Sequence, residues 1–177
     1  MGAFVSLAFR WHGTLEQLSS LDGAFESAGL AFVHGGELAE GQSLSTWMLS
    51  IDGEREKVTR RCYGEGRYVS TTIDIEEERF DVLAQRIGRH RLIERFVKLG
   101  CELLRALKLN YVFFEEEAEA DLDPETFDGT RLFGISIVPD NAPWLDNALG
   151  REDIQRVERL PGAVVIYRRT DPVPHLG

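Results

Sequence analysis

The sequence predicts an α+β fold: an antiparallel or mixed sheet of about six to eight strands with one long helix packed across a face. Two observations carry this prediction. Residues 45–51, 57–63 and 67–75 alternate apolar and polar side chains and are separated by Asp-Gly and Gly-Glu-Gly turns, which is typical of an antiparallel meander. From about residue 80 to 108, apolar residues recur at helical spacing, which predicts a long amphipathic helix.

The N-terminal part predicts a strand, a capped helix and a second strand. Residues 3–11 and 30–34 are rich in large apolar and aromatic side chains. Thr14 and Gln17 have the spacing of a capping box, in which the two side chains satisfy backbone N–H groups of the first helical turn. Gly29 stands where the C-terminal cap of this helix is expected.

The C-terminal part predicts three further strands, at 111–114, 131–138 and 162–169, and a short helix at 140–150. Residues 151–160 are ambiguous and slightly favour a helix. A chain of 177 residues has the length of one ordinary domain. We therefore expect a single domain over 1–170, followed by a proline-bearing tail at 171–177.

The net charge and the cysteine content argue against several classes of function. The net charge is −10 and the pI is about 4.9, which argues against nucleic acid as a partner, because phosphate binders present a basic face. No apolar run has the length of a membrane span. Cys62 and Cys101 are far apart and form no zinc-binding pattern. We expect a cytoplasmic, bacterial protein with two buried, reduced thiols and no membrane contact.

The most unusual stretch is an acidic run that follows the strand at 111–114. Its eight carboxylates are Glu115, Glu116, Glu117, Glu119, Asp121, Asp123, Glu125 and Asp128. Three interpretations stay open: a solvated edge, a surface for a basic partner, and a metal site. An EF-hand calcium loop starting at Asp121 is excluded, because Thr126 and Leu132 stand where glycine and glutamate are required.

Each interpretation names its own residues. A binding surface would use acidic side chains together with an exposed aromatic anchor, since interfaces favour tryptophan. Its predicted members are Glu115, Glu117, Glu119, Asp121, Asp123 and Trp144. Trp47 is a second aromatic candidate, but its alternating position predicts a place in the core. A metal site would combine Glu117 and Asp121 with His90 and Glu94, which are spaced i, i+4 on the long helix.

Catalytic motifs are not found. His34-Gly35-Gly36 has the composition of an oxyanion loop, but the chain has no G-x-S-x-G elbow to accompany it. It also has no phosphate-binding glycine loop and no H-E-x-x-H pair. We therefore assign no catalytic residue and expect no cofactor.

These observations favour a small acidic, non-enzymatic module that binds or inhibits a basic protein. Bacterial immunity and anti-toxin proteins have this general character, although the analogy rests on no shared motif. Two alternatives remain at this stage: a divalent-metal-dependent hydrolase that uses the carboxylates of 115–128, and a small-ligand-binding domain with a pocket between helix and sheet. The sequence does not indicate the oligomeric state.

Overall fold

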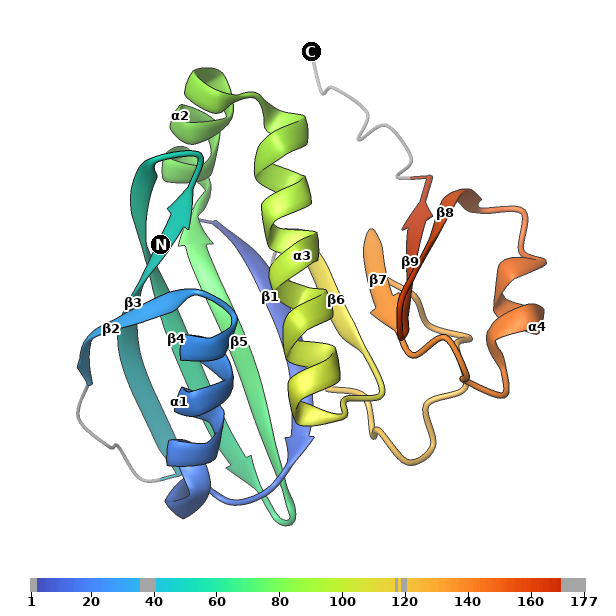
Figure 1. Ribbon diagram of the computed structural model, residues 1–177. Helices are drawn as coiled ribbons and strands as arrows, with labels where there is room; N and C mark the ends of the chain where they lie inside the picture. Colours follow the sequence, from blue (N-terminus) through green and yellow to red (C-terminus); the bar gives the residue numbers. More distant parts are fainter. Residues whose placement is uncertain (1–2, 36–40, 117, 119–120, 170–177) are drawn as a thin grey trace.

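The computed structural model describes residues 3–35, 41–116, 118 and 121–169, which form one nine-stranded antiparallel sheet with helices packed on it (Figure 1). The strands are β1 (Phe4–His12), β2 (Leu30–Gly35), β3 (Gln42–Ile51), β4 (Glu54–Glu65), β5 (Tyr68–Glu76), β6 (Val112–Glu116), β7 (Ile135–Val138), β8 (Ile154–Leu160) and β9 (Ala163–Arg168). The helices are α1 (Leu18–Ser27), α2 (Glu77–Ile87), α3 (Arg89–Leu107) and α4 (Leu145–Leu149). The strand order is β2-β3-β4-β5-β1-β6-β7-β9-β8. The predicted α+β fold on an antiparallel sheet is confirmed.

Helices α1, α2 and α3 cover one face of the sheet (Figure 1). The longest, α3, lies against β1, β6, β7 and β9 and buries its apolar stripe there. Phe96 of this stripe stacks on Phe114 of β6, with ring centroids 5.1 Å apart. Gly100 permits a close approach of helix and sheet, because a Cβ at this position would lie 2.4 Å from Cδ1 of Ile137.

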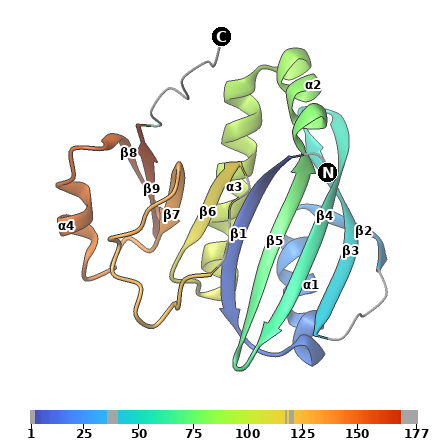
Figure 2. The same ribbon diagram turned by 180° about the vertical axis from the view of Figure 1, so that it is seen from behind.

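A second apolar core lies on the opposite face of β6, β7 and β9. Side chains along residues 111–114 alternate between the two cores: Val112 and Phe114 belong to the helix-side core, whereas Tyr111 and Phe113 belong to the second core. The segments 121–134 and 139–149, the second of which includes α4, cover this face (Figure 2). The rings of Phe113 and Phe133 lie 4.4 Å apart within it.

The one long helix predicted over about 80–108 is two helices, α2 and α3, divided at Gly88, where the sequence allowed a split into a short first piece and a long second one. Gly88 lies between them with φ of +93°, a backbone conformation outside the helical region that glycine tolerates readily. The helical pattern also begins earlier than predicted, at Glu77.

The sheet has nine strands instead of six to eight, and the additional one is β8. Residues 151–160 slightly favoured a helix, but Ile154–Leu160 pairs with β9 as the edge of the sheet. The turn between these strands contains Gly162 at φ of +74°. Backbone pairing with β9 therefore overrides the local helical preference.

Other boundaries differ less. The strand predicted at 131–138 is confined to β7, and the helix predicted at 140–150 is confined to α4. The predicted hairpin turn is confirmed, since Asp52 and Gly53 have φ of +48° and +85°. The capping box is present at the start of the first helical segment, where the Thr14 backbone N–H donates to Gln17 Oε1 over 3.0 Å. The tail at 171–177 lies outside the described residues.

Candidate functional site

One face of β1, β3, β4 and β5 has no helix over it (Figure 2). It arises from the alternation of side chains along these strands. In β3 and β5, Trp47, Leu49 and Ile73 point to the helices and are buried, whereas Thr46 and Thr72 point the other way and are half-buried. We call the surface made by these outward side chains of β1, β3, β4 and β5 the open face.

Six polar side chains stand in register across six neighbouring strands. In strand order they are His34, Thr46, Thr59, Asp74, Ser6 and Glu115, each directly opposite the next. Directly paired residues of adjacent strands point to the same side of a sheet. The strands thus bring together residues that are widely separated in the sequence, in what we call the polar row.

Asp74 is the centre of the polar row and is only 5% exposed. Its carboxylate accepts hydrogen bonds from the hydroxyls of Ser6, at 2.6 Å, and Thr72, at 3.1 Å. The Nε atom of Arg61 lies 3.0 Å from it, and the same guanidinium stands 4.6 Å from the centre of the Phe4 ring. Buried charge is tolerated when it is paired and hydrogen-bonded in this way.

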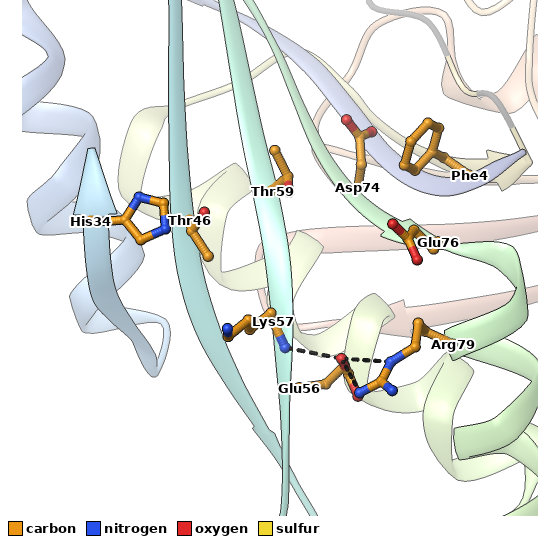
Figure 3. Close-up of a pocket in the computed structure, with 9 residues that line it drawn as sticks. All are labelled: Phe4, His34, Thr46, Glu56, Lys57, Thr59, Asp74, Glu76 and Arg79. Atoms are coloured by element: carbon orange, nitrogen blue, oxygen red, sulfur yellow. Dashed lines mark hydrogen bonds and ion pairs between the residues drawn. The ribbon is translucent and has the colours of Figure 1, made fainter. Parts of the chain in front are cut away.

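A hollow of about 480 Å³ lies along the polar row, and its lining comes from β1 to β5 and from α2 (Figure 3). At its margin Arg79 of α2 holds the buried Glu56 carboxylate with hydrogen bonds of 3.0–3.2 Å. Lys57 and Glu76, which also line the hollow, have no ion-pair partner among the described residues. The hollow is therefore polar, with charges of both signs.

The geometry of the polar row does not assemble a nucleophile with a base. Ser6 donates to Asp74, but His34 stands three strands away from Asp74, which is about 14 Å at the usual strand spacing. A catalytic imidazole must lie within hydrogen-bond reach of the group it deprotonates. His34 and Gly35 are the last two residues of strand β2, and Gly36 lies outside the described residues. The arrangement suits binding better than acyl transfer.

The acidic run packs as part of the cover over the second core, and most of its described carboxylates have partners within the chain. Glu115 accepts a hydrogen bond from the Gly134 backbone N–H over 3.1 Å. Asp121 forms an ion pair with Arg131 at 3.1 Å.

Further along the run, Glu125 forms an ion pair with Arg67. Asp123 accepts from the backbone N–H of Glu125 and Asp128 accepts from that of Thr130. The bonds from Thr130 hold the pKa of Asp128 below its ordinary value. Local partners of this kind reduce the mutual repulsion of the run.

The predicted metal ligands are not brought together among the residues that the structure describes. His90 and Glu94 are neighbours on α3, 3.0 Å apart, and both are exposed. Glu117 and Glu119 lie outside the described residues. Within the described ranges no group of three or more histidine, cysteine, aspartate or glutamate side chains could hold a metal ion.

The two tryptophans singled out from the sequence have different environments. Trp47 is fully buried and packs against Phe25, with ring centroids 5.1 Å apart, as its alternating position predicted. Trp144 is half-buried and lies beside Phe127 in the loop that leads into α4, at a centroid distance of 5.0 Å. Gly129 packs under its ring, because a Cβ there would lie 2.3 Å from Cε3 of Trp144.

A second acidic surface was missed from the sequence. Glu76, Glu77 and Glu78 end β5 and begin α2, and Glu116 ends β6. Phe4 pairs with Glu76, and the adjacent Val5 pairs with Glu116 on the other side of β1. The backbones of Glu76 and Glu116 are therefore about two strand spacings, or about 10 Å, apart. Their side chains point to opposite faces, because Phe4 and Val5 are adjacent in β1. We call Glu76, Glu77, Glu78 and Glu116 the acidic end.

None of the four acids of the acidic end has an ion-pair partner among the described residues. The sequence signal was the three consecutive glutamates at 76–78. Only the pairing of β1 with both β5 and β6 reveals that they lie near Glu116.

The cysteines are both buried, Cys62 fully and Cys101 at 1% exposure. Burial raises the pKa of both thiols, which disfavours the reactive thiolate.

Comparisons with protein families, with curated proteins and with solved structures found no match to this chain. Among the described residues, no helix is both long enough and apolar enough to cross a membrane.

Proposed function

We propose that the protein is a non-enzymatic module that binds and inhibits a basic protein partner through its open face and acidic end. The observation that carries this proposal is the difference in cover between the two faces of the sheet at β3, β4 and β5. A broad sheet face whose side chains are ordered but uncovered is a suitable surface for another protein. The polar row supplies the half-buried side chains of Thr46 and Thr59, beside the buried Asp74.

The side chains around the polar row support the proposal. Leu44 and Tyr63 are large and exposed, at 46% and 38%, although they stand on the open face of central strands. Met48 and Arg61 stand on the same face and are half-buried. Aromatic residues, methionine and arginine are enriched at protein interfaces relative to the rest of the surface.

Charge supports a basic partner. The chain carries a net charge of −10. Glu76, Glu77 and Glu78 of the acidic end line one hollow together with Phe4 and have no ion-pair partner among the described residues. A surface of this kind accelerates the encounter with a protein of opposite charge and loses that advantage as salt is raised.

The test is affinity capture with charge-matched variants. One bait carries Glu76→Gln, Glu77→Gln and Glu78→Gln. Its control carries Glu26→Gln, Asp146→Asn and Glu152→Gln, three exposed acids on α1, α4 and the loop before β8 that remove the same charge elsewhere. We expect the wild type and the control to retain a basic protein at low salt, and the acidic-end variant to lose it.

Binding must then be repeated with the purified partner, because retention from a mixture is not specific on its own. A third variant, Tyr63→Ala with Leu44→Ala, is expected to weaken the purified complex by a faster dissociation rate and to abolish inhibition of any activity the partner has. Equal retention by all variants, or retention that does not respond to salt, would contradict the proposal.

The hollow beside the polar row favours a second candidate, a small-ligand-binding domain. Its volume of about 480 Å³ lies within the range of ligand pockets, about 300–1,000 Å³. A polar ligand held there would raise the melting temperature of the wild type and lose that effect in Lys57→Ala. Stabilisation by a small molecule without any protein partner would favour this candidate over the first.

A further inference from the structure

A second hollow, of about 370 Å³, lies away from the polar row, between the segment 124–127 and the loop that enters α4. Its apolar wall contains Phe127 and Trp144, whose rings meet at 79°. One carboxylate, that of Glu125, and two amide side chains, of Asn110 and Asn141, provide the polar lining. Aromatic rings beside a carboxylate are the lining that organic cations prefer.

Several hydrogen-bond donors of the lining are missing or already used. Three of its nine residues are prolines, which have no backbone N–H. Other donors are already used: the Glu125 N–H donates to Asp123, the Ala142 N–H donates to the Pro139 carbonyl, and the Asn110 side-chain amide donates to the Pro124 carbonyl. A ligand rich in donors is therefore matched to this site better than an anion or an acceptor.

The charges near the hollow also favour a cationic ligand. No lysine, arginine or histidine lines it. Arg67 pairs with Glu125 from outside, and both members of that pair are more than half exposed, so their mutual attraction is weak and exchangeable. Lys108, which has no ion-pair partner among the described residues, lines the adjoining hollow with Asn110.

Glu125 already interacts with two donors of the chain. Besides Arg67, the hydroxyl of Tyr68 interacts with it, and desolvation together with that hydrogen bond raises the pKa of Tyr68. Glu125 therefore lines the hollow and already accepts one guanidinium, that of Arg67.

We infer that this hollow binds the guanidinium group of an arginine side chain of the protein partner, with Phe127 and Trp144 as the stacking surface and Glu125 as the counter-ion. Guanidinium is planar, weakly hydrated and able to stack on aromatic rings while it donates to a carboxylate, which compact ammonium groups do less well. The source of the arginine rests on the proposed function, whereas the chemistry of the site does not.

The test uses no partner. A capped Gly-Arg-Gly peptide is titrated into ¹⁵N-labelled protein while the indole resonance of Trp144 is followed. Trp11 and Trp47 are buried, at 7% and 0% exposure, so their resonances serve as internal references, and Trp144→Phe assigns the signal. The matched probe is the capped Gly-citrulline-Gly peptide, which has nearly the same shape and no charge.

We expect a saturable shift of the Trp144 signal with the arginine peptide, and roughly tenfold weaker binding of the citrulline peptide, the ratio that a difference of about 1.4 kcal/mol produces. Glu125→Gln should reduce the affinity for the arginine peptide to that for the citrulline peptide. Asp146→Asn, which removes an exposed charge outside the lining, should not.

No saturable shift at tens of millimolar peptide would overturn the inference, and so would equal affinity for the two peptides. The two proposals fail separately. If the peptide binds as expected but no basic protein is captured by the acidic-end experiment, the proposed function fails and the cation site stands. If a basic protein is captured but Glu125→Gln leaves both the peptide titration and the capture unchanged, the cation site alone fails.

Discussion

The two halves of the sheet differ in how many faces are covered. In β3, β4 and β5, helices cover one face and the other is the open face (Figure 2). In β6, β7 and β9, helix α3 covers one face and the segments 121–134 and 139–149 cover the other. The burial of consecutive side chains differs accordingly: burial alternates along residues 45–51, whereas Val112–Phe114 and Ala163–Ile166 are buried without interruption.

Under the proposed function, this difference indicates where a partner would bind. A strand covered on both faces has no exposed side chains and forms a continuous apolar run. In β3 and β4, which are covered on one face, the side chains that point to the other face are exposed or half-buried. Because most described carboxylates of the acidic run at 115–128 already have partners within the chain, the open half and Glu76, Glu77 and Glu78 of the acidic end become the stronger candidates for recognition.

The largest effect should follow truncation in the doubly covered half. Phe113 is fully buried and its ring contacts those of Tyr111 and Phe133, so Phe113→Ala should lower the free energy of unfolding by about 3–5 kcal/mol. Leu44→Ala on the open face should cost less than about 1 kcal/mol, because Leu44 is 46% exposed. Denaturant unfolding measures both, and equal losses would show that the second core is not packed as described.

Removing the centre of the polar row should have the next largest effect. Asp74→Ala leaves Arg61, Ser6 and Thr72 without their shared acceptor and should cost about 2–3 kcal/mol. Glu76→Ala, two residues further on the same face, removes an exposed carboxylate without an ion-pair partner and should change stability by less than about 0.5 kcal/mol. If Asp74→Ala lost no more stability than Glu76→Ala, the description of Asp74 as buried and paired would be contradicted.

Gly129 and Gly66 provide a matched pair. Both have positive φ, +75° and +64°, so alanine brings a similar backbone strain to each. Only at Gly129 would the added Cβ meet the Trp144 ring, whereas nothing lies within 4 Å at Gly66. Gly129→Ala should therefore be the more destabilising by about 1–2 kcal/mol and should shift the Trp144 indole resonance. Equal stability of the two variants would show that Trp144 is not held by this contact.

The smallest expected effect depends on pH. Tyr111 is buried, its hydroxyl donates to the Leu122 carbonyl over 2.6 Å, and desolvation raises its pKa. In the unfolded chain a tyrosine ionises near pH 10. The unfolded state therefore loses the proton first, and stability falls as pH rises above about 10. Tyr111→Phe should have a lower stability at neutral pH and a flatter dependence above pH 10; an unchanged slope would contradict this assignment.

Much of this fold could be predicted from the sequence, where local patterns determine the structure. The alternation in 45–51 and 67–75 and the Asp52-Gly53 turn placed the meander, and Thr14 and Gln17 placed the first helical segment. Edge strand β8 was not predicted, because its structure depends on backbone pairing with β9 and not on its own composition.

The candidate site was less predictable for the same reason. The polar row joins His34, Asp74 and Glu115 through the strand order β2 to β6, and no local pattern contains that order. The acidic run drew attention by composition, although its described carboxylates mostly have partners in the chain. Trp144 was named as an anchor from the sequence, but its neighbours Phe127 and Gly129 appear only in the fold.

The most direct test of the account is the chemical accessibility of the two sheet halves. Thr59→Cys places a thiol in the polar row on β4, next to Asp74, and Ser136→Cys places one on β7 under the second core, where Ser136 is fully buried. The native thiols of Cys62 and Cys101 are buried and provide the baseline. We predict that in the native state a thiol reagent modifies the cysteine at 59 rapidly and the one at 136 only on unfolding. Similar rates at the two positions would contradict the division of the sheet into an open half and a covered half.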